Sequence, residues 1–279
     1  MINADMRKFT TYRLKGIIKE VVYPKNTLEL TDVLKKLKGQ KHMVLGNGSN
    51  VVFTSDYDGT IIKLDHFDEF LVNDDEVTVG AGYSLIKLAL KTANMGLSGL
   101  EFASGIPGTV GGSVYGNAGA YKKDMASVIK EVTILNSDLK VQTLSLEQMA
   151  FGYRKSILQE NNFICLKAIF KLEHKNRKEI LDVIKKRKEK RKISQPLEYP
   201  SAGSVFRNPD GDYAGRIIEQ LGFKGKNVGD AFVSLKHANF IINKGNACGK
   251  DIETLVNLIK KEAFKKYNIN LVTEQEFIE

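Results

Sequence analysis

The stretch from Gly105 to Tyr121 constrains the fold of this chain more than any other. It reads GIPGTVGGSVYGNAGAY, so glycine recurs through a segment that has no charged side chain. Glycine tolerates a positive φ and lets the backbone approach a ligand or another segment closely. A second glycine-bearing piece, GNGSN at 46–50, follows a short apolar run at 43–45. Two such loops predict main-chain N–H groups that bind phosphate, and therefore a nucleotide-like cofactor.

The order of helix and strand patterns predicts a mixed α+β fold. Residues 27–38 have helical apolar spacing and lie between two strand-like apolar runs, 20–23 and 43–45. We expect Ser84 and Asp251 to cap the helices that they begin. Further strands are expected at 60–64, 76–81, 132–135, 164–172 and 239–243, and further helices at 84–93, 174–192, 213–221 and 251–266.

Composition and cysteine usage narrow the class of protein. The 279 residues, 42% of them hydrophobic, are enough for two domains with a buried core. No apolar run approaches the ~20 residues that a membrane helix needs, and the N-terminus lacks a secretory signal. Cys165 and Cys248 each stand alone, without disulfide or metal-ligand spacing. We therefore expect a reduced, cytoplasmic protein that holds no metal and is not inserted in a membrane.

The formal net charge of +9 is concentrated in residues 174–192. Positive potential attracts nucleic acid, but it equally attracts nucleotide cofactors. The apolar stripe of Ile180, Leu181, Val183 and Ile184 favours a helix with a solvated basic face. No aromatic residues interleave with the basic ones to stack on bases, so a nucleic-acid partner is not expected.

The familiar nucleotide and hydrolase motifs are absent. GNGSNV lacks the third glycine of the dinucleotide fingerprint and continues as a strand at 51–53, and no G-K-[S/T] occurs. No G-x-S-x-G elbow surrounds Ser204, and His237 is the only plausible base for a serine hydrolase. By itself, Ser204 also fits a structural role in a loop. Arg154 also fits a packed surface pair with an aromatic neighbour, and Glu274 fits a frayed chain end.

Six motifs in fixed order resemble the UDP-N-acetylenolpyruvoylglucosamine reductase (UDP-N-acetylmuramate dehydrogenase) family, over Phe9 to Ile278. The motifs are GNGSN at 46–50, GLEFASGIPGTVGGSVYGNAGAY at 99–121, FGYRKS at 151–156, SAGSVFRNP at 201–209, SLKHANFIIN at 234–243 and LVTEQEFI at 271–278.

The resemblance implies a flavoenzyme of peptidoglycan precursor synthesis with a fold like that of vanillyl-alcohol oxidase. An FAD-binding region, 1–195, would consist of two α/β subdomains at about 1–65 and 66–195, which the tail 274–279 would join. A C-terminal α/β substrate-binding domain would cover 196–273. NADPH would reduce the non-covalent FAD, which would then reduce the enolpyruvyl ether of UDP-N-acetylglucosamine to UDP-N-acetylmuramate. No obligate protein partner is expected.

The resemblance also assigns roles to residues. Ser204 would be the general acid that protonates the substrate's α-carbon. Arg154 and Glu274 would interact with the carboxylate as it takes on enolate character, which requires Glu274 to be protonated or bridged. The residues expected to bind FAD are Gly46, Asn47, Gly48, Ser49, Asn50, Gly105, Ile106, Pro107, Gly108, Thr109, Gly112, Asn117 and Gly119. Those expected to bind the UDP-sugar are Arg191, Arg207, Asn208, Lys236 and His237.

The chain departs from the family pattern at three places. Residues 12–16 lack the usual Gly-Gly pair, Lys122 replaces a common glycine, and Gln275 replaces the usual valine. The short stretch 154–172 indicates the class without an extra substrate-covering loop.

Two alternatives remain open at this point. One is an FAD-dependent oxidase of small alcohols or sugars on the same fold; such enzymes often attach the flavin to a histidine, and neither glycine-rich loop has one. The other is a non-catalytic nucleotide- or RNA-binding protein, in which Ser204 and Glu274 would be dispensable.

Overall fold

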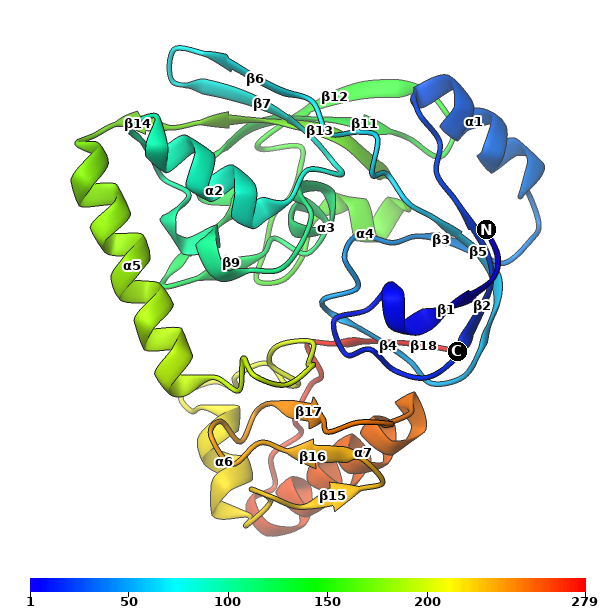
Figure 1. Cartoon of the computed structure of the whole chain (residues 1–279), viewed down its shortest axis with the longest axis vertical. Coiled ribbons are helices and arrows are strands. Elements are labelled where there is room, and N and C mark those ends of the chain that lie inside the picture. Colours follow the sequence, from blue (N-terminus) through cyan, green and yellow to red (C-terminus); the bar gives the residue numbers. More distant parts are fainter. The chain divides into compact units, whose positions relative to one another are not determined.

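A computed structural model describes all residues, 1–279 (Figure 1). The chain divides into two compact units. Unit 1 contains Met1–Val21, Gly48–Thr60 and Lys190–Glu279, and unit 2 contains Val22–Asn47 and Ile61–Glu189. No helix has the length and the apolar character that crossing a membrane requires. Both units are discontinuous in sequence. The predicted functional boundary at Pro196 stays a prediction.

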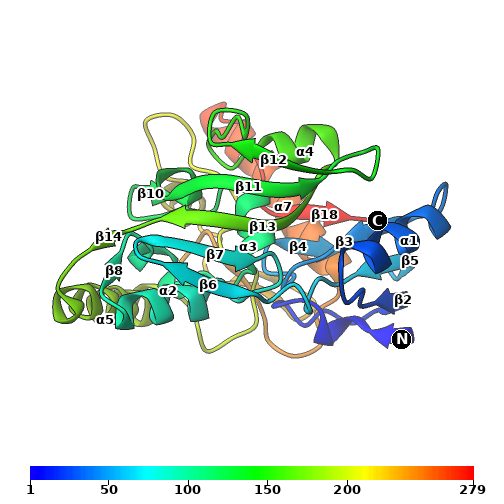
Figure 2. The same cartoon turned by 90° about the horizontal axis from the view of Figure 1, so that it is seen from above.

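Unit 2 is built on a five-stranded antiparallel sheet (Figure 2). The strand order is β12 (Val141–Ser145), β11 (Ile129–Leu135), β13 (Ile164–Lys171), β7 (Glu76–Gly80) and β6 (Phe70–Asn73). The central strand β13 pairs with β11 on one side and β7 on the other. Its Ala168 and Phe170 are fully buried, in agreement with the alternation expected for a sheet that covers a core on one face.

Helices α2 (Leu85–Asn94) and α3 (Val110–Tyr115) cover one face of this sheet (Figure 1). The Ser84 hydroxyl accepts a hydrogen bond from the Lys87 N–H group, so the predicted cap of α2 is confirmed. Thr109 caps α3, which the sequence did not predict because glycine disfavours helix. The buried core includes Leu85, Leu88, Val110, Val114, Val77, Val79, Ile134 and Phe170.

The remaining elements of unit 2 surround this core. They are α1 (Thr27–Lys36), β3 (His42–Val44), β8 (Leu97–Ser98), the 3-10 helices η2 (Glu101–Gly105) and η3 (Met125–Ser127), the hairpin β9 (Gly119–Ala120) and β10 (Lys123–Asp124), α4 (Ile157–Asn161) and β14 (Glu173–His174).

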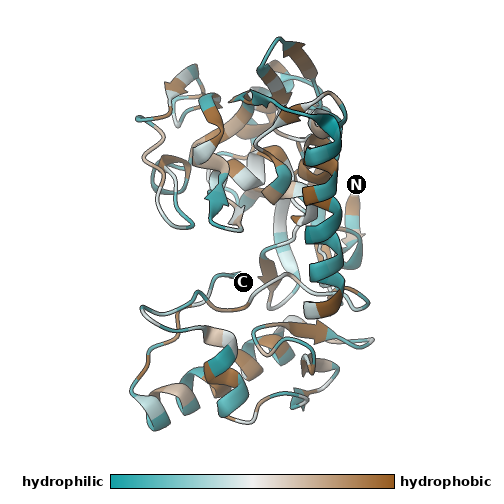
Figure 3. Cartoon of the chain, turned by 90° about the vertical axis from the view of Figure 1, so that its left-hand side faces the viewer, coloured by the Kyte–Doolittle hydropathy of each residue, from teal (hydrophilic) through white to brown (hydrophobic).

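The basic helix α5 (Arg177–Ser194) ends before Gln195-Pro196, as predicted. It is hydrophilic over most of its length (Figure 3). Only Ile180 and Ile184 are buried, packed with Ala93, while Val183 is 39% exposed. The apolar stripe is therefore narrower than the sequence indicated.

Unit 1 has a second core around a small antiparallel sheet. The sheet has the order β15 (Asn227–Val228), β16 (Ala231–Val233), β17 (Ile241–Asn243), and the helices are α6 (Ala214–Gln220) and α7 (Gly249–Tyr267). Ile217, Ile252, Leu255 and Ile259 are buried among them. The prediction that Asp251 caps α7 is wrong. Cys248 is the cap, and the Asp251 carboxylate accepts from the Cys248 N–H group at 2.9 Å.

The N-terminal segments and the C-terminal tail complete unit 1. β1 (Ile2–Asp5) leads through the 3-10 helix η1 (Met6–Lys8), and it pairs antiparallel with β2 (Ile17–Val22). β18 (Glu276–Ile278) pairs in parallel with β4 (Val51–Phe53), and β5 (Tyr57–Ile62) follows. The C-terminus is thus a paired strand and not a frayed end.

Gly249 is expected to be essential for packing α7 against β4, because a Cβ there would collide with the Phe53 carbonyl oxygen. We predict that Gly249→Ala lowers the free energy of unfolding by about 2 kcal/mol or more, since overpacking against fixed backbone forces the helix to move. Urea denaturation measures this change. The control is Gly215→Ala, where the new Cβ makes only an ordinary contact, 3.5 Å from the His237 ring. Equal losses in the two variants would contradict the prediction.

Candidate functional site

The two glycine-rich segments meet in unit 2. The Asn47 side-chain amide donates to the Pro107 carbonyl at 3.1 Å. A Cβ at Gly46 would lie 2.7 Å from the Thr109 hydroxyl oxygen. The structure therefore brings together two of the segments that the sequence predicted to bind a cofactor.

The main-chain N–H groups of the 46–50 loop donate to no other protein group, while several of its carbonyls accept. The Gly48 carbonyl accepts from the Thr11 N–H group at 3.1 Å, and the Asn50 carbonyl accepts from the Glu276 N–H group at 2.9 Å. Thr10 precedes Thr11, and its hydroxyl is buried without a hydrogen-bond partner. Unused amide donors beside a buried hydroxyl are what an anion such as pyrophosphate would bind.

Lys63 is a cation beside this loop that the sequence reasoning missed. Its ammonium group donates to the Gly46 carbonyl and lies 3.4 Å from an Asp65 carboxylate oxygen. The residue is 7% exposed, and this burial lowers the pKa of the Lys63 amine. The only signal in the sequence is one lysine within an otherwise apolar strand, TIIKL at 60–64. A buried lysine that holds the loop's carbonyl can offset the charge of a bound phosphate.

The third predicted segment of unit 2, FGYRKS, also reaches the glycine-rich segment. The Asn117 amide donates to the Gly152 carbonyl at 2.8 Å and to the Asp124 carboxylate at 3.0 Å, and its oxygen accepts from the Ala126 N–H group. Its side chain thus binds protein groups, and its main-chain N–H group donates to the Val114 carbonyl at 3.2 Å, so Asn117 holds the segment in place and offers no donor to a cofactor. The Ser156 hydroxyl donates to the Tyr115 carbonyl at 2.7 Å.

Arg154 is held at the edge of this cluster. Its guanidinium donates to the Gly119 carbonyl at 3.0 Å and lies 5.1 Å from the Tyr153 ring centre. Its φ of 58° places a non-glycine residue in the left-handed region, which costs on the order of 1 kcal/mol and is common at functional sites.

Unit 1 contains a hollow of about 430 Å³ that groups four of the predicted site residues. Ser204, Asn208, Lys236 and His237 line it, whereas Arg191 and Arg207 do not. The other lining residues are Tyr213, Gly215, Arg216, Glu219, Lys224, Ala238 and Asn239.

Hydrogen bonds fix the side chains around the hollow. The Asn208 oxygen accepts from the Ala214 N–H group at 3.1 Å, and the Lys236 ammonium donates to the Lys192 carbonyl at 2.9 Å. The His237 Nδ1 atom accepts from the Asn239 N–H group at 3.2 Å, which leaves the ring proton on Nε2. Burial lowers the pKa of His237, so a neutral ring that donates from Nε2 is favoured.

Arg216 and Lys224 also line the hollow, and sequence reasoning did not select them. Each is paired with a carboxylate, Arg216 with Asp212 and Lys224 with Glu219 at 2.6 Å. Nothing in the sequence distinguishes these two residues from other charged residues. Only the fold brings them to the hollow that Ser204 lines. Lys236 is paired in the same way with Glu198 at 3.3 Å, so a diphosphate in the hollow would bind these cations in competition with their carboxylates.

Glu274 lies on the segment that pairs with the Ser204 loop. Its N–H group donates to the Val205 carbonyl at 2.8 Å, and its own carbonyl accepts from the Asn50 amide at 3.0 Å. The Arg207 N–H group donates to the Val272 carbonyl at 2.9 Å, which extends the pairing. Ser204, Glu274 and the end of the 46–50 loop therefore form one cluster in unit 1.

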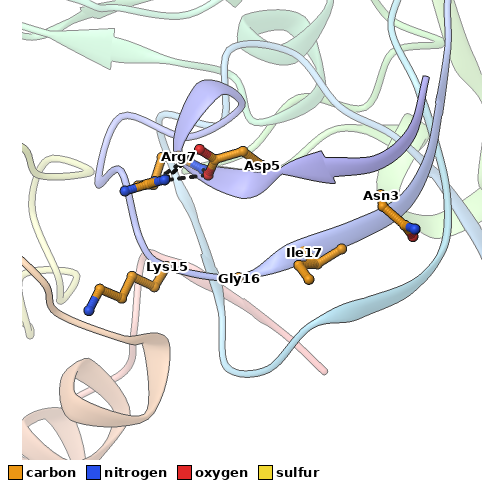
Figure 4. A pocket seen from close by; sticks show the side chains of 6 residues that line it. All are labelled: Asn3, Asp5, Arg7, Lys15, Gly16 and Ile17. Carbon is orange, nitrogen blue, oxygen red and sulfur yellow. Dashed lines mark hydrogen bonds and ion pairs between the residues drawn. The ribbon is translucent and has the colours of Figure 1, made fainter.

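Unit 1 has a second hollow, of about 360 Å³, whose lining residues differ from those of the Ser204 hollow (Figure 4). None of the predicted site residues lines it. Its Arg7 guanidinium binds the Asp5 carboxylate through three hydrogen bonds, at 2.9, 3.0 and 2.8 Å. The chain therefore has two candidate sites, the Ser204 hollow of unit 1 and the meeting point of the glycine-rich segments in unit 2.

Family models match most of the chain and define its class. The FAD binding domain family matches residues 18–145, which include both glycine-rich loops. The C-terminal domain of UDP-N-acetylenolpyruvoylglucosamine reductase matches residues 195–278, which include the Ser204 hollow and Glu274. The protein is an FAD-dependent oxidoreductase with a mixed α+β fold. Its unused loop amides and the buried Lys63 fit the pyrophosphate of that cofactor.

Relatives specify the family. The UDP-N-acetylenolpyruvoylglucosamine reductases of Bacillus licheniformis and Anoxybacillus flavithermus are each 43% identical to this chain, over 99% of it and 93% of their own length. The enzyme of Bacillus subtilis is 40% identical over 100% of the chain and 93% of its own length. The crystal structure of the Thermus caldophilus reductase matches with a TM-score of 0.86 at 34% identity, covering 99% of this chain and 98% of that one. The chain belongs to the UDP-N-acetylenolpyruvoylglucosamine reductase family.

Lys63→Met is expected to weaken FAD binding. It removes a buried cation and its hydrogen bond to the Gly46 carbonyl, and hydrogen bonds from charged groups contribute about 1.5–3 kcal/mol. We predict a rise of at least ~10-fold in the Kd for FAD, measured by flavin fluorescence on cofactor-free protein. Lys167→Met is the matched control, because it removes a partly exposed lysine of unit 2 that forms an ion pair with Glu69. Equal changes in the two variants would contradict a specific role for Lys63.

Proposed function

We propose that this protein reduces the enolpyruvyl ether of UDP-N-acetylglucosamine to UDP-N-acetylmuramate, with NADPH as the reductant, in the bacterial cytoplasm. The observation that carries the proposal is the cluster in unit 1. It places a serine hydroxyl, Ser204, in a hollow with several cations and beside the Glu274 segment. Family membership supports the same reaction, since the relatives bear the name of this reductase.

The reaction adds one hydride and one proton across a carbon–carbon double bond. When bound, FAD supplies the hydride after taking it from NADPH. The remaining work belongs to the side chains of the protein, which must stabilise negative charge and deliver the proton. Ser204 donates the proton from its Oγ atom to the α-carbon. A serine suffices as the acid because the carbon that it protonates is strongly basic.

Arg154 and Glu274 act on the substrate's carboxylate. Arg154 is permanently charged and has a forked guanidinium, which suits a carboxylate that gains enolate character. Its hydrogen bond to the Gly119 carbonyl holds part of that fork in place. Glu274 contributes as a protonated or bridged acid, so that it does not repel the substrate.

The cations of the hollow bind the UDP portion of the substrate. Lys236, Arg216 and Lys224 supply the positive charge, and the neutral His237 ring supplies a donor at Nε2. The Asn208 side chain, whose oxygen accepts from the Ala214 N–H group at the start of α6, adds a polar group there. Arg191 and Arg207, which do not line the hollow, remain proposed contacts of the substrate.

Ser204→Ala should separate the two halves of the reaction. Flavin reduction by NADPH should proceed as in the unmodified protein, because no proton from Ser204 is needed for it. Reoxidation by the enolpyruvyl sugar should slow by about 10²–10⁴-fold, the usual contribution of a general acid. Anaerobic stopped-flow absorbance of the flavin measures both rates. Normal reoxidation would show that another group delivers the proton.

Glu274→Gln should slow the same half-reaction by about 10²-fold, because it removes an acid that faces the charge developing on the substrate. Glu262→Gln offers a matched comparison, since it makes the same change in unit 1 on α7, at a residue that does not line the hollow. We expect that control to stay within a few-fold of the unmodified rate. If the two variants lose activity equally, the proposed role of Glu274 is wrong.

A further inference from the structure

A buried glutamine contacts the loop that carries Ser204. Gln275 is 2% exposed. Its amide nitrogen donates to the Ala202 carbonyl at 3.1 Å and to the Gly203 carbonyl at 3.3 Å. These are the two residues directly before Ser204. Gly203 has a φ of 75°, so the chain turns sharply at the position where the glutamine holds it.

A buried tyrosine fixes the orientation of this amide. The Tyr12 hydroxyl donates to the Gln275 oxygen at 3.2 Å, and Tyr12 is fully buried. Burial raises the pKa of Tyr12, so the phenol keeps its proton and remains a donor. Because the oxygen of the amide faces Tyr12, its nitrogen must face the two carbonyls. The Asn243 amide in turn donates to the Tyr12 carbonyl at 2.9 Å, which anchors the tyrosine's own main chain.

A second amide holds the loop on the other side of Ser204. The Asn239 side chain accepts from the Phe206 N–H group at 2.9 Å and donates to the Phe206 carbonyl at 2.8 Å. Its main-chain carbonyl accepts from the Val205 N–H group at 2.9 Å. Gln275 thus holds Ala202 and Gly203 on one side of Ser204, and Asn239 holds Val205 and Phe206 on the other side.

Gln275 also adjoins Glu274 in the chain, and the Glu274 N–H group donates to the Val205 carbonyl at 2.8 Å. Gln275 therefore fixes the distance between the Ser204 loop and the tail segment that carries the Glu274 carboxyl group. Interactions of a buried polar network of this kind are strong because every member has its partner.

We propose that Gln275, oriented by Tyr12, is a positioning residue that sets the Ser204 hydroxyl for proton transfer. This inference rests on the proposed role of Ser204 as the proton donor. A displacement of about 1 Å in a reacting group can cost ~10²-fold in rate. Loss of the two hydrogen bonds should therefore affect the proton-transfer half of the reaction and leave the other half unchanged.

The test uses the FAD-loaded, full-length protein and three variants. Gln275→Met keeps the size of the side chain and removes its donors. Tyr12→Phe removes only the group that orients the amide. Thr60→Val is the matched control, because it removes a different hydrogen bond of a buried residue in unit 1, from the Thr60 hydroxyl to Glu20. Each variant is measured for FAD Kd, for flavin reduction by NADPH, and for reoxidation by the enolpyruvyl sugar.

We expect Gln275→Met to slow reoxidation by about 10- to 100-fold and Tyr12→Phe by about 3- to 10-fold, on the scale that small misplacements produce. Flavin reduction and the FAD Kd should stay within twofold in both, as in Thr60→Val. In a Ser204→Ala background, Gln275→Met should cause no further loss, because there is then no hydroxyl to position.

Gln275→Glu supplies a readout that a merely structural role would not change. An ionised carboxylate at this position would place an acceptor against two carbonyl oxygens, whereas the protonated acid has one O–H donor. The reoxidation rate of this variant should therefore recover as the pH falls, while that of the unmodified protein should not.

Three results would overturn the inference. One is a Gln275→Met rate within twofold of the unmodified rate while Ser204→Ala is slow, which leaves the role of Ser204 intact. Another is an equal fall in both half-reactions and in FAD binding, which would mean a general structural role. The third is normal reoxidation in Ser204→Ala. That result removes the proposed proton donor itself, and the positioning role with it.

Discussion

The site in unit 1 depends on main-chain pairing between the C-terminal tail and the loop after Ser204. The Glu274 N–H group donates to the Val205 carbonyl, and the Arg207 N–H group donates to the Val272 carbonyl. The tail then continues as β18 beside β4, which directly follows the 46–50 loop. These hydrogen bonds turn a terminus that would otherwise fray into a fixed element. They also bring Ser204, Glu274 and the end of the glycine-rich 46–50 loop into one cluster.

In unit 2 the corresponding constraint is close approach of the backbone. Gly46 lies against Thr109, and the Asn47 amide binds the Pro107 carbonyl, so two glycine-rich segments share one surface. At position 46 only a residue without a Cβ permits this packing. The arrangement uses the loop's carbonyls within the protein and leaves its N–H groups for an anion. Lys63 adds a positive charge to the partial positive charges of the N–H groups. Because Lys63 is buried, solvent screens its charge little.

Buried side-chain amides organise both units. Asn117 joins the glycine-rich segment to FGYRKS, while Asn239 and Gln275 hold the two sides of the Ser204 loop. An amide both donates and accepts, so a single residue can fix two segments in a defined orientation. Such residues act through the groups that they hold, and they determine where the reacting groups lie. They also explain why loops, and not regular elements, carry this site with fixed geometry.

The sequence alone determined the α+β class, most elements, the cap at Ser84, the glycine-rich loops and, through six ordered motifs, the family. These features follow from local periodicity and from residues whose conformational preferences are strong. Tertiary structure alone decided α3, which forms in a glycine-rich segment because it packs on β13, and the cap of α7, which is Cys248 instead of Asp251. It also decided the roles of Lys63, Arg216, Lys224 and Gln275. Gln275 contacts a segment far away in the chain, and the other three residues matter because the fold brings a loop or a hollow beside them, which no local pattern specifies.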